Sequence, residues 1–557
     1  MTFAPPINQP IGKIADVLAQ NIVQASDLRN DGDHKYLTTE IPVSDPPLPT
    51  SSASQYIYVP LTSSQVDVVE FQKSFFKISF NLTLNLNGFE ANNADDNAYG
   101  KTFAWYFFGL KHSSDIIGDY QIRYKGKPVA IQPNATTESF IYQSLRDNSE
   151  IIYRPGNHTT SKSAESILGQ SEGVCGSYVR IDEIQDAVAN NNSINVGISM
   201  IIPFTDIQIF QQFNDYPNSI FGDLEIGFKV NTGAFVCMNT NPIKNWEGLC
   251  RINPDFDDLE QVSSALIKGD RDYDKEFIQL GDKFRGITHC KTNGGFITIE
   301  AKDDVSFSVE SFSVEKCSSF ISGYNVESSA LERIRKTDMD KPWVVFTQTI
   351  DIRSFNHSPT NLGIDTSQQV RFNNTTDIIL LFPTTPNEVH GTVMKNPMLT
   401  NLNIFTMGNS YPQTPISTRS VETTQLMINS CLVKNTTPQR DFALSLIQER
   451  WTNEDDFKTN FSDGTTFLLD LKVERSSALG LMNDGLDSDG KNENVRLYAR
   501  PQFSQQDGDK YCYAQGVPPP VIAVVGDAYW AFNSRNGGNC MISSQPFEKQ
   551  IPVFMSS

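Results

Sequence analysis

The sequence lacks the features that identify several common classes of protein. No basic stretch followed by an apolar stretch stands at the amino terminus, so we expect no secretory signal peptide. No run reaches about 18 consecutive apolar residues, so we expect no membrane-spanning helix. Heptads and short tandem repeats are also absent, which argues against a long coiled coil and a solenoid.

Metal-binding patterns are missing as well. The chain has eight cysteines and six histidines, without a Cys-x-x-Cys or His-x-x-x-His pair. His289 and Cys290 are neighbours, but two side chains are too few for a zinc site. We therefore predict no metal site and no cofactor. Without a signal peptide, we expect reduced, buried thiols at Cys175, Cys237, Cys250, Cys290, Cys317, Cys431, Cys512 and Cys540.

Basic residues are fewer than acidic residues. The chain has 45 Lys and Arg against 65 Asp and Glu, for a formal net charge of −20. An anionic surface repels phosphate backbones, so we expect no direct binding of nucleic acid by the main body. Basic runs interleaved with aromatic residues and a phosphate-binding GxxxxGK[ST] loop are absent. The same negative net charge also keeps a protein soluble.

Two short motifs resemble functional sites, but the residues around them do not match what such sites require. Gly169 to Gly173 has the G-x-S-x-G spacing, but a nucleophile elbow needs an apolar strand before it and a helix after it. SKSAESIL precedes this motif and VCGSYVR follows it. We interpret it as a loop, with Ser171 as the nucleophile of a hydrolase being the alternative.

Asp484 to Gly490 resembles a calcium loop, but Gly485 and Arg496 occupy the positions that require acids, so we interpret it as an acidic turn. Acidic pairs are plentiful, yet the sequence does not say which face one another, so a glycosidase is unsupported. We expect no catalytic site.

The residues that are abundant indicate β-structure. Hydrophobic residues make up 39% and charged residues 20% of the 557 positions, which is enough for a core. The 36 Phe, with 29 Pro and 34 Gly, suit strands joined by many turns. The clearest strand runs from Phe76 to Leu86, where apolar and polar residues alternate. At about 3.3 Å per residue its length is about 36 Å, which is natural for a tall sandwich.

Other elements follow from the same patterns. The register of apolar residues slips near Glu310-Ser311, which predicts a bulge. Residues 147–194 are mostly polar, which predicts a long loop, a polar excursion before the next core strand. We predict helices at 11–22, 136–146, 326–335 and 441–451. We predict further strands at 102–111, 119–125, 196–204, 224–230, 296–300, 305–314, 343–352, 378–383, 467–474, 495–501 and 521–532.

One stretch has an echo elsewhere in the chain. IFQQFNDYPNS at 209–219 and IFTMGNSYPQT at 404–414 share Ile, Phe, Asn, Tyr and Pro in one ungapped register. The two copies do not occupy equivalent positions in the two expected domains, because far more residues follow the second copy before its domain ends than follow the first. We give the echo little weight as evidence of duplication.

Residues 56–240 carry a family resemblance. FNDYPNSIFGDLEI at 213–226, Gly109-Leu110-Lys111, Tyr120-Gln121-Ile122 and Glu138-Ser139-Phe140 match a recurring pattern. Through these motifs the chain resembles the major capsid proteins of Polinton/Maverick elements, adintoviruses and virophages. The second half resembles that family only in length and strand content.

The resemblance implies an all-β fold of two tandem eight-stranded jelly rolls, a double jelly roll, with long loop insertions and a few short helices. We expect an N-terminal arm at 1–55, a first jelly roll at 56–240, a connector at 241–294 and a second jelly roll with insertions and a C-terminal tail at 295–557. In this scheme the stretch at 196–237 closes the first jelly roll.

The resemblance also implies a function. The chain would form homotrimers that act as pseudo-hexagonal capsomers, and capsomer–capsomer contacts would build an icosahedral shell. Penton and minor capsid proteins would be its partners, and it would lie in the virion after assembly inside the host cell. The alternatives are a β-sandwich adhesin or carbohydrate-binding protein and, less well supported, a β-sandwich hydrolase.

Overall fold

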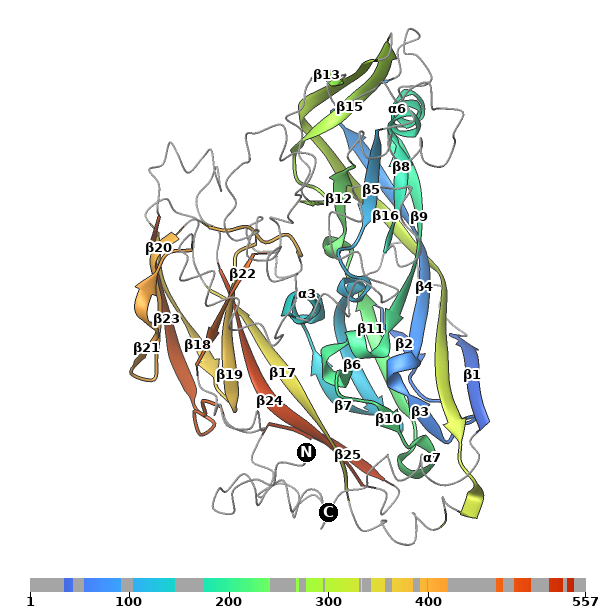
Figure 1. Ribbon diagram of the computed structural model, residues 1–557, viewed down its shortest axis with the longest axis vertical. Helices are drawn as coiled ribbons and strands as arrows, with labels where there is room; N and C mark the ends of the chain where they lie inside the picture. The colour runs from blue at the N-terminus through green and yellow to red at the C-terminus, as the bar shows by residue number, and fades with distance from the viewer. Residues whose placement is uncertain are drawn as a thin grey trace.

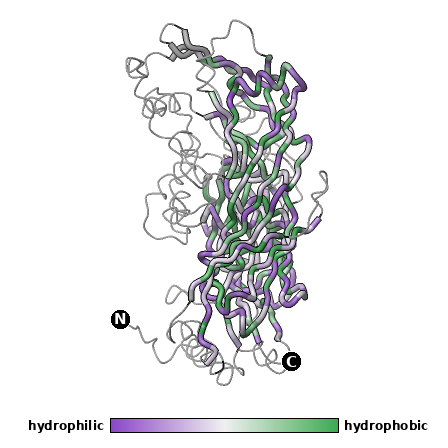
Figure 2. Tube along the Cα trace, turned by 90° about the vertical axis from the view of Figure 1, so that its right-hand side faces the viewer, coloured by the Kyte–Doolittle hydropathy of each residue, from purple (hydrophilic) through white to green (hydrophobic). Residues whose placement is uncertain are grey.

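The chain forms two β-sandwiches that stand side by side, with most strands running along the tall axis of the molecule (Figure 1). The hydropathy of successive residues alternates along many strands (Figure 2). The computed structural model describes residues 35–43, 55–91, 104–145, 175–240, 267–269, 277–293, 296–329, 332, 342–355, 363–383, 391–397, 399–418, 467–473, 485–501, 520–533 and 538–544.

The carboxy-terminal sandwich consists of two antiparallel sheets. One has the strand order β17-β24-β19-β22 and the other β18-β23-β20-β21. Counted along the chain, the orders are first-eighth-third-sixth and second-seventh-fourth-fifth, which is a jelly roll. The strands are β17 (Trp343–Ser354), β18 (Ile364–Arg371), β19 (Thr375–Leu381), β20 (Leu399–Thr406), β21 (Asn409–Ile416), β22 (Leu468–Lys472), β23 (Asn492–Pro501) and β24 (Val521–Asn533), and β25 (Asn539–Ser543) pairs with β24.

One sheet of the amino-terminal sandwich is built around a very long strand, β16 (Phe296–Asn325). Strand β16 pairs with β1 on one side and with β3 and β4 on the other. Beyond these, β9 pairs with β4, and β10 pairs with β3. The partners are β1 (Lys35–Pro42), β3 (Val68–Glu70), β4 (Phe75–Asn87), β9 (Ser193–Pro203) and β10 (Asp215–Tyr216); β13 (Ile267–Gly269) and β15 (Phe284–Asn293) pair with the beginning of β16.

The opposite layer is divided into two short sheets. Their strand orders are β2-β11-β6-β7 and β14-β12-β5-β8. Some neighbouring segments, such as β3 and β4 or β11 and β12, each correspond to one interrupted strand. Counted in this way, the amino-terminal sandwich has the same jelly-roll strand order as the carboxy-terminal sandwich. The chain is therefore a double jelly roll. The strands are β2 (Ile57–Pro60), β5 (Trp105–Gly109), β6 (Ile117–Tyr124), β7 (Lys127–Gln132), β8 (Gly176–Arg180), β11 (Leu224–Val230), β12 (Val236–Asn239) and β14 (Ile278–Gln279).

The observed domain boundary differs from the expected one. Strand β1 lies within the expected arm, and β16 lies within the expected second jelly roll, yet both belong to the first sandwich. The expected connector at 241–294 also holds β13, β14 and β15 of that sandwich. The physical reason is the topology, because the last strand of a jelly roll pairs with its first and third strands. The first jelly roll thus closes with β16, not at residue 240, and the second begins at Trp343.

Most local predictions within the described residues are confirmed. Strand β4 buries every second side chain, as its alternation predicted. The pairing of β16 with β4 shifts register between Val309 and Ser311, where the bulge was expected, and again between Val314 and Lys316. Helix α3 (Ala135–Leu145) was expected; α6 (Ile181–Asn190) was not, and it falls in the stretch predicted to be a polar excursion. The predicted helices at 11–22 and 441–451, most of that at 326–335, and Ser171 lie outside the described residues.

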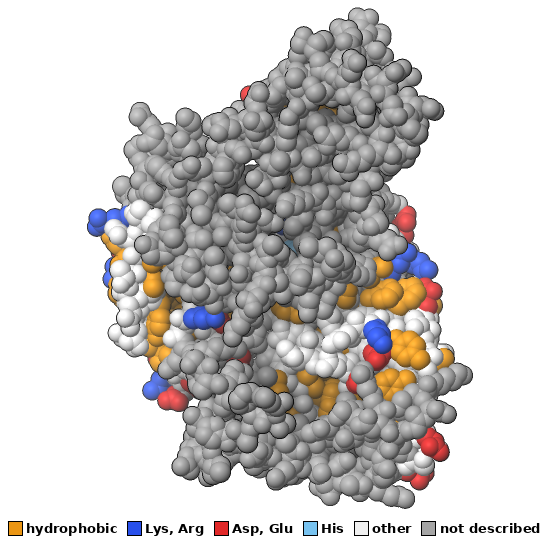
Figure 3. Space-filling model, in the orientation of Figure 1, with side chains coloured by type: hydrophobic (Ala, Val, Ile, Leu, Met, Phe, Trp, Pro, Cys, Tyr) orange, Lys and Arg blue, Asp and Glu red, His pale blue; other side chains and the backbone are white. Residues whose placement is uncertain are grey.

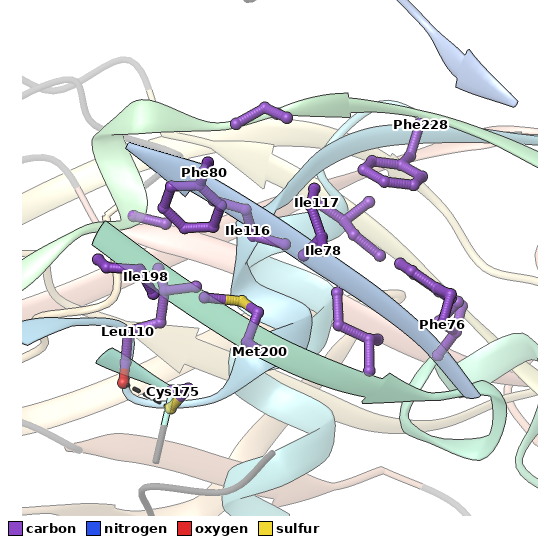
Figure 4. Packing of buried hydrophobic residues seen from close by; sticks show 14 of the residues in the cluster. Phe76, Ile78, Phe80, Leu110, Ile116, Ile117, Cys175, Ile198, Met200 and Phe228 are labelled. Carbon is purple, nitrogen blue, oxygen red and sulfur yellow. Dashed lines mark hydrogen bonds between the residues drawn. The ribbon is translucent and has the colours of Figure 1, made fainter. Parts of the chain in front are cut away.

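The core of the first sandwich is packed between its two layers (Figure 4). Phe76 of β4 stacks on Phe228 of β11, with ring centroids 5.4 Å apart. The five described cysteines are free, and the Cys175 thiol donates to the Leu110 carbonyl oxygen at 2.9 Å. Burial raises the pKa of Cys290 and of Cys317 to about 12. These thiols therefore stay protonated and inert at neutral pH, as expected for structural cysteines.

Candidate functional site: the contact between the two sandwiches

The segment 204–221 connects β9 with β11 and lies against the second sandwich. Two 3-10 turns, η5 (Phe204–Asp206) and η6 (Gln208–Phe210), are followed by β10 and by the short helix α7 (Asn218–Phe221). Pro203 ends β9, and Pro217 stands just after β10. Because proline has no backbone N–H to donate, both are suited to positions where strand pairing stops.

Seven aromatic side chains meet where this segment touches the second sandwich, and we call this cluster the aromatic seam. Phe210 stacks on Trp530 with ring centroids 5.7 Å apart. Phe213 meets Trp530 edge to face at 5.5 Å. Phe221 stacks on Trp343 at 5.7 Å. All are at most 5% exposed, so the seam is packed like a protein core. Its members are Phe210, Phe213, Tyr216 and Phe221 of the first sandwich and Trp343, Trp530 and Phe532 of the second.

Hydrogen bonds fix the register of the seam. The carbonyl oxygen of Ile209 accepts from Trp530 Nε1 at 2.9 Å and from Thr347 Oγ1 at 3.0 Å. The Tyr216 hydroxyl donates to the Gly222 carbonyl oxygen at 2.7 Å within the first sandwich. Buried donors must find acceptors, so the two bonds to Ile209 favour one relative position of the sandwiches over a shifted one.

Asn218 holds the segment on the first sandwich. Its Nδ2 donates to the Ser63 carbonyl oxygen at 2.8 Å, and the residue is 6% exposed. We expect Asn218→Ala to lower the free energy of unfolding by about 1 kcal/mol, because it removes a buried hydrogen bond. The Ser63 carbonyl oxygen keeps the backbone N–H of Val66 as a donor, at 3.2 Å. Urea unfolding followed by circular dichroism measures this. Asn87→Ala, at the exposed end of β4, is the control and should unfold like the wild type.

A second contact is made by helix α3, which lies between the two sandwiches (Figure 1). Phe140 and Ile141 of α3 are fully buried in the hydrophobic core of the second sandwich, together with Ile350 and Ile352 of β17. Beside them, Gln132 Nε2 of β7 donates to the Ile350 carbonyl oxygen at 3.0 Å. The second core is therefore completed by side chains of the first sandwich.

A third contact lies near β12 and β14. Val393 packs with Phe107, Val236, Met238 and Phe277 in one apolar cluster. In the described part of the chain the two sandwiches thus touch at the aromatic seam, at α3 and at this cluster, and β25 also lies against β7. Such an extended apolar contact favours one rigid block over two mobile domains.

Ser139, one of the motif residues of the family resemblance, belongs to a buried polar network under α3. Ser139 Oγ donates to Asp115 Oδ1 at 2.7 Å, and Ser114 and Ser139 share a hydroxyl contact of 2.7 Å. His112 Nδ1 lies 3.4 Å from Asp115 Oδ2. A Ser, a His and an Asp are present, but the hydroxyl of Ser139 bonds to the Asp rather than to the His, and all three are at most 7% exposed. The network therefore positions helix α3 and does not form a nucleophile–base pair open to substrate.

The other candidate residues lie apart from this contact. The described part of the calcium-like stretch, 485–490, forms a turn in which the Asp489 backbone N–H donates to Asp487 Oδ1 at 2.9 Å. His289 Nδ1 contacts Thr288 Oγ1 at 3.2 Å and Glu300 at 3.7 Å. Within the described ranges, no three His, Cys, Asp or Glu side chains are placed to hold a metal ion. No helix in the same ranges is long and apolar enough to span a membrane.

Comparison with protein-family models and with curated sequences gives no match. Among solved structures, a chain in the cryo-electron microscopy structure of the Sputnik virophage is 11% identical, with a TM-score of 0.47 over 94% of this chain and 92% of that chain. The mavirus major capsid protein is 11% identical, with a TM-score of 0.44 over 92% of each chain. A chain of the PBCV-1 virus capsid is 7% identical, with a TM-score of 0.41 over 91% of this chain and 97% of that chain.

Proposed function

We propose that the chain is a major capsid protein, whose copies assemble into the shell of a virion. One observation carries the proposal: a single chain holds two jelly rolls of the same strand order, joined side by side by a core-like contact. Jelly rolls of this type serve as building blocks of viral shells. Part of the family motifs supports the same function, because Phe213, Tyr216, Phe221 and Phe140 lie in that contact.

The proposed assembly unit is a homotrimer. Each chain contributes two similar wedges, so three chains around a threefold axis present six wedges and imitate sixfold symmetry. Such a unit tiles a closed surface only if the two wedges keep a fixed relation, which is what the aromatic seam and α3 favour. The net charge of −20 suits a shell that encloses nucleic acid without binding it tightly.

The size of the particle tests this function. We expect the purified full-length chain to form a species of about 190 kDa, three times the chain mass of 62.3 kDa. Native mass spectrometry over a range of protein concentrations gives the mass, and negative-stain electron micrographs give the shape. Pseudo-hexagonal particles are the expected result.

A chain that stays monomeric at every concentration would contradict the proposal. A monomer that binds carbohydrates on a glycan array would instead support the adhesin. The seam variant Trp530→Ala tests whether trimer formation depends on the contact between the two sandwiches of one chain. If the wild type is a trimer and only this variant is a monomer, trimer formation requires the fixed relation of the two wedges.

A further inference from the structure

Glu138 is a buried carboxyl group at the junction of the two sandwiches. It lies in α3, two and three residues before the side chains that complete the second core, Phe140 and Ile141. Glu138 is 4% exposed. On the space-filled face, by contrast, described charged side chains of both signs lie at the surface (Figure 3). A carboxyl buried at such a place is either neutral or costly.

The hydrogen-bond donors around Glu138 are too few to stabilise its charged form fully. Its Oε1 accepts from the Tyr120 hydroxyl at 2.9 Å. Its Oε2 has no hydrogen-bond partner among the described residues. The nearby amide of Gln132 donates to the Ile350 carbonyl oxygen. A carboxylate needs several donors when it is removed from water. Glu138 has the Tyr120 hydroxyl and a Gln132 amide that it shares with Ile350, and its Oε2 has none.

We propose that Glu138 is a proton-dependent latch between the two jelly rolls. With a proton, the side chain lies under α3, and the helix inserts Phe140 and Ile141 into the second sandwich. Without the proton, the carboxylate needs water, and α3 must move away from β6 for water to reach it. That movement withdraws the two apolar side chains, so the contact between the sandwiches loosens.

The direction of the pH dependence follows from burial. Burial raises the pKa of Glu138 from 4.5 to about 7, against the opposite influence of Gln132 and Tyr120. A carboxyl exposed by opening titrates near the lower value. The closed contact is therefore fully stabilised below pH 4.5, becomes less stable as the pH rises, and has lost this stabilisation above about pH 7.

Other charged residues near α3 make contacts of their own. Asp115 of η3 (Ser113–Ile116) accepts from Ser139, with His112 beside it. Lys111 Nζ lies 5.8 Å from the centre of the Phe140 ring and 5.4 Å from that of Phe277. In η5 the backbone carbonyl of Asp206 accepts from Gln143. None of these charges is among the causes of the Glu138 shift.

Charges on the strands that pack against α3 are also paired. On β6, Asp119 pairs with Lys229 at 2.8 Å, and Arg123 lies over the Tyr58 ring. On β17, Arg353 pairs with Asp351 at 3.1 Å, and both are largely exposed. Segment η6 carries no charged side chain. Glu138 is thus a group whose ionisation this contact accommodates poorly.

Hydrogen exchange of the full chain tests the latch. We expect opening of α3, corrected for the intrinsic pH dependence of exchange, to increase on the order of tenfold between pH 5.5 and pH 8 in the wild type. Glu138→Gln keeps the shape without the charge, so its opening should stay at the low-pH level throughout. Tyr120→Phe removes the donor to Oε1, which should move the midpoint of the wild-type transition to higher pH.

Two controls isolate the effect. Glu225→Gln changes a carboxyl on β11 that is 37% exposed, and it should leave the wild-type profile unchanged. His112→Gln measures any contribution from the imidazole beside Asp115. The latch is refuted by a wild-type profile without pH dependence, or by a Glu138→Gln profile that runs parallel to it. If Glu138→Gln does not fold, an unshifted midpoint in Tyr120→Phe refutes the latch.

Discussion

Trp530→Ala is expected to lower the free energy of unfolding by about 3–5 kcal/mol, the range for removing a buried large aromatic side chain. Trp530 is fully buried in the aromatic seam, where its ring stacks on Phe210 and on Phe532. The substitution also removes the Nε1 donor to the Ile209 carbonyl oxygen. Because the cavity lies between the sandwiches, we further expect their unfolding transitions to separate. Chemical unfolding followed by circular dichroism measures both effects.

Two matched variants divide this effect into its parts. Trp530→Phe keeps a ring but loses the N–H donor, and Ile209 still accepts from Thr347, so we expect a loss of about 1 kcal/mol. Phe405→Ala removes an aromatic side chain that is 45% exposed on β20, and it should change stability by less than about 0.5 kcal/mol. If Trp530→Ala behaved like Phe405→Ala, the seam would not hold the sandwiches together.

Gly323→Ala is expected to disrupt the sheet of the first sandwich. Gly323 lies in β16 between β1 and β3, opposite Leu37 and Val69. A Cβ atom there would stand 2.1 Å from the carbonyl oxygen of Val68, so backbone would have to move. Overpacking of this kind costs about 3 kcal/mol or more. Thermal unfolding and the yield of soluble protein measure the loss.

Gly197→Ala is the control for this substitution. Gly197 is also a strand glycine of the same sheet, in β9, but its Cβ would meet only Asn81 Oδ1, at 3.2 Å. We expect its stability to stay within about 1 kcal/mol of the wild type. Equal stability of the two variants would show that β16 and β3 do not approach each other as closely as described.

Local structure was predictable because it depends on neighbouring residues. Alternation of apolar side chains predicted β4 and β11 to within one residue, since successive side chains of a strand point to opposite faces. A slip in the same alternation located the bulge in β16. Helix α6 was missed because it is short and polar on its outer face, within a stretch of low hydropathy.

Pairing between distant segments was not predictable in this way. Nothing in the local pattern of Lys35–Pro42 indicates that it pairs with the end of β16. The domain boundary was therefore placed at a change of composition, although the first sandwich continues past it. The contact of Trp530 with Ile209 is equally remote, because 321 positions separate the two residues.

The stretch at 196–237 has a different role from the expected one. It was expected to close the first jelly roll, whereas β16 does so, and residues 209–221 join the two sandwiches. The echo at 404–414 forms the hairpin of β20 and β21. Its counterpart at 209–219 lies in the connection between β9 and β11. The two copies occupy different positions in the jelly-roll order, so the echo does not relate equivalent parts of the two halves.

The position of β16 has a consequence for synthesis of the chain on the ribosome. The sheet that begins with Lys35 is completed only when Asn325 has been made, because these residues are register partners. Until then β4 lacks its neighbour along an exposed edge, and such edges favour pairing with other chains. Contacts this far apart in sequence also form slowly. Nascent chains of this protein therefore carry an unpaired edge of β4, at which they can pair with one another, until the thirty-residue strand β16 has emerged.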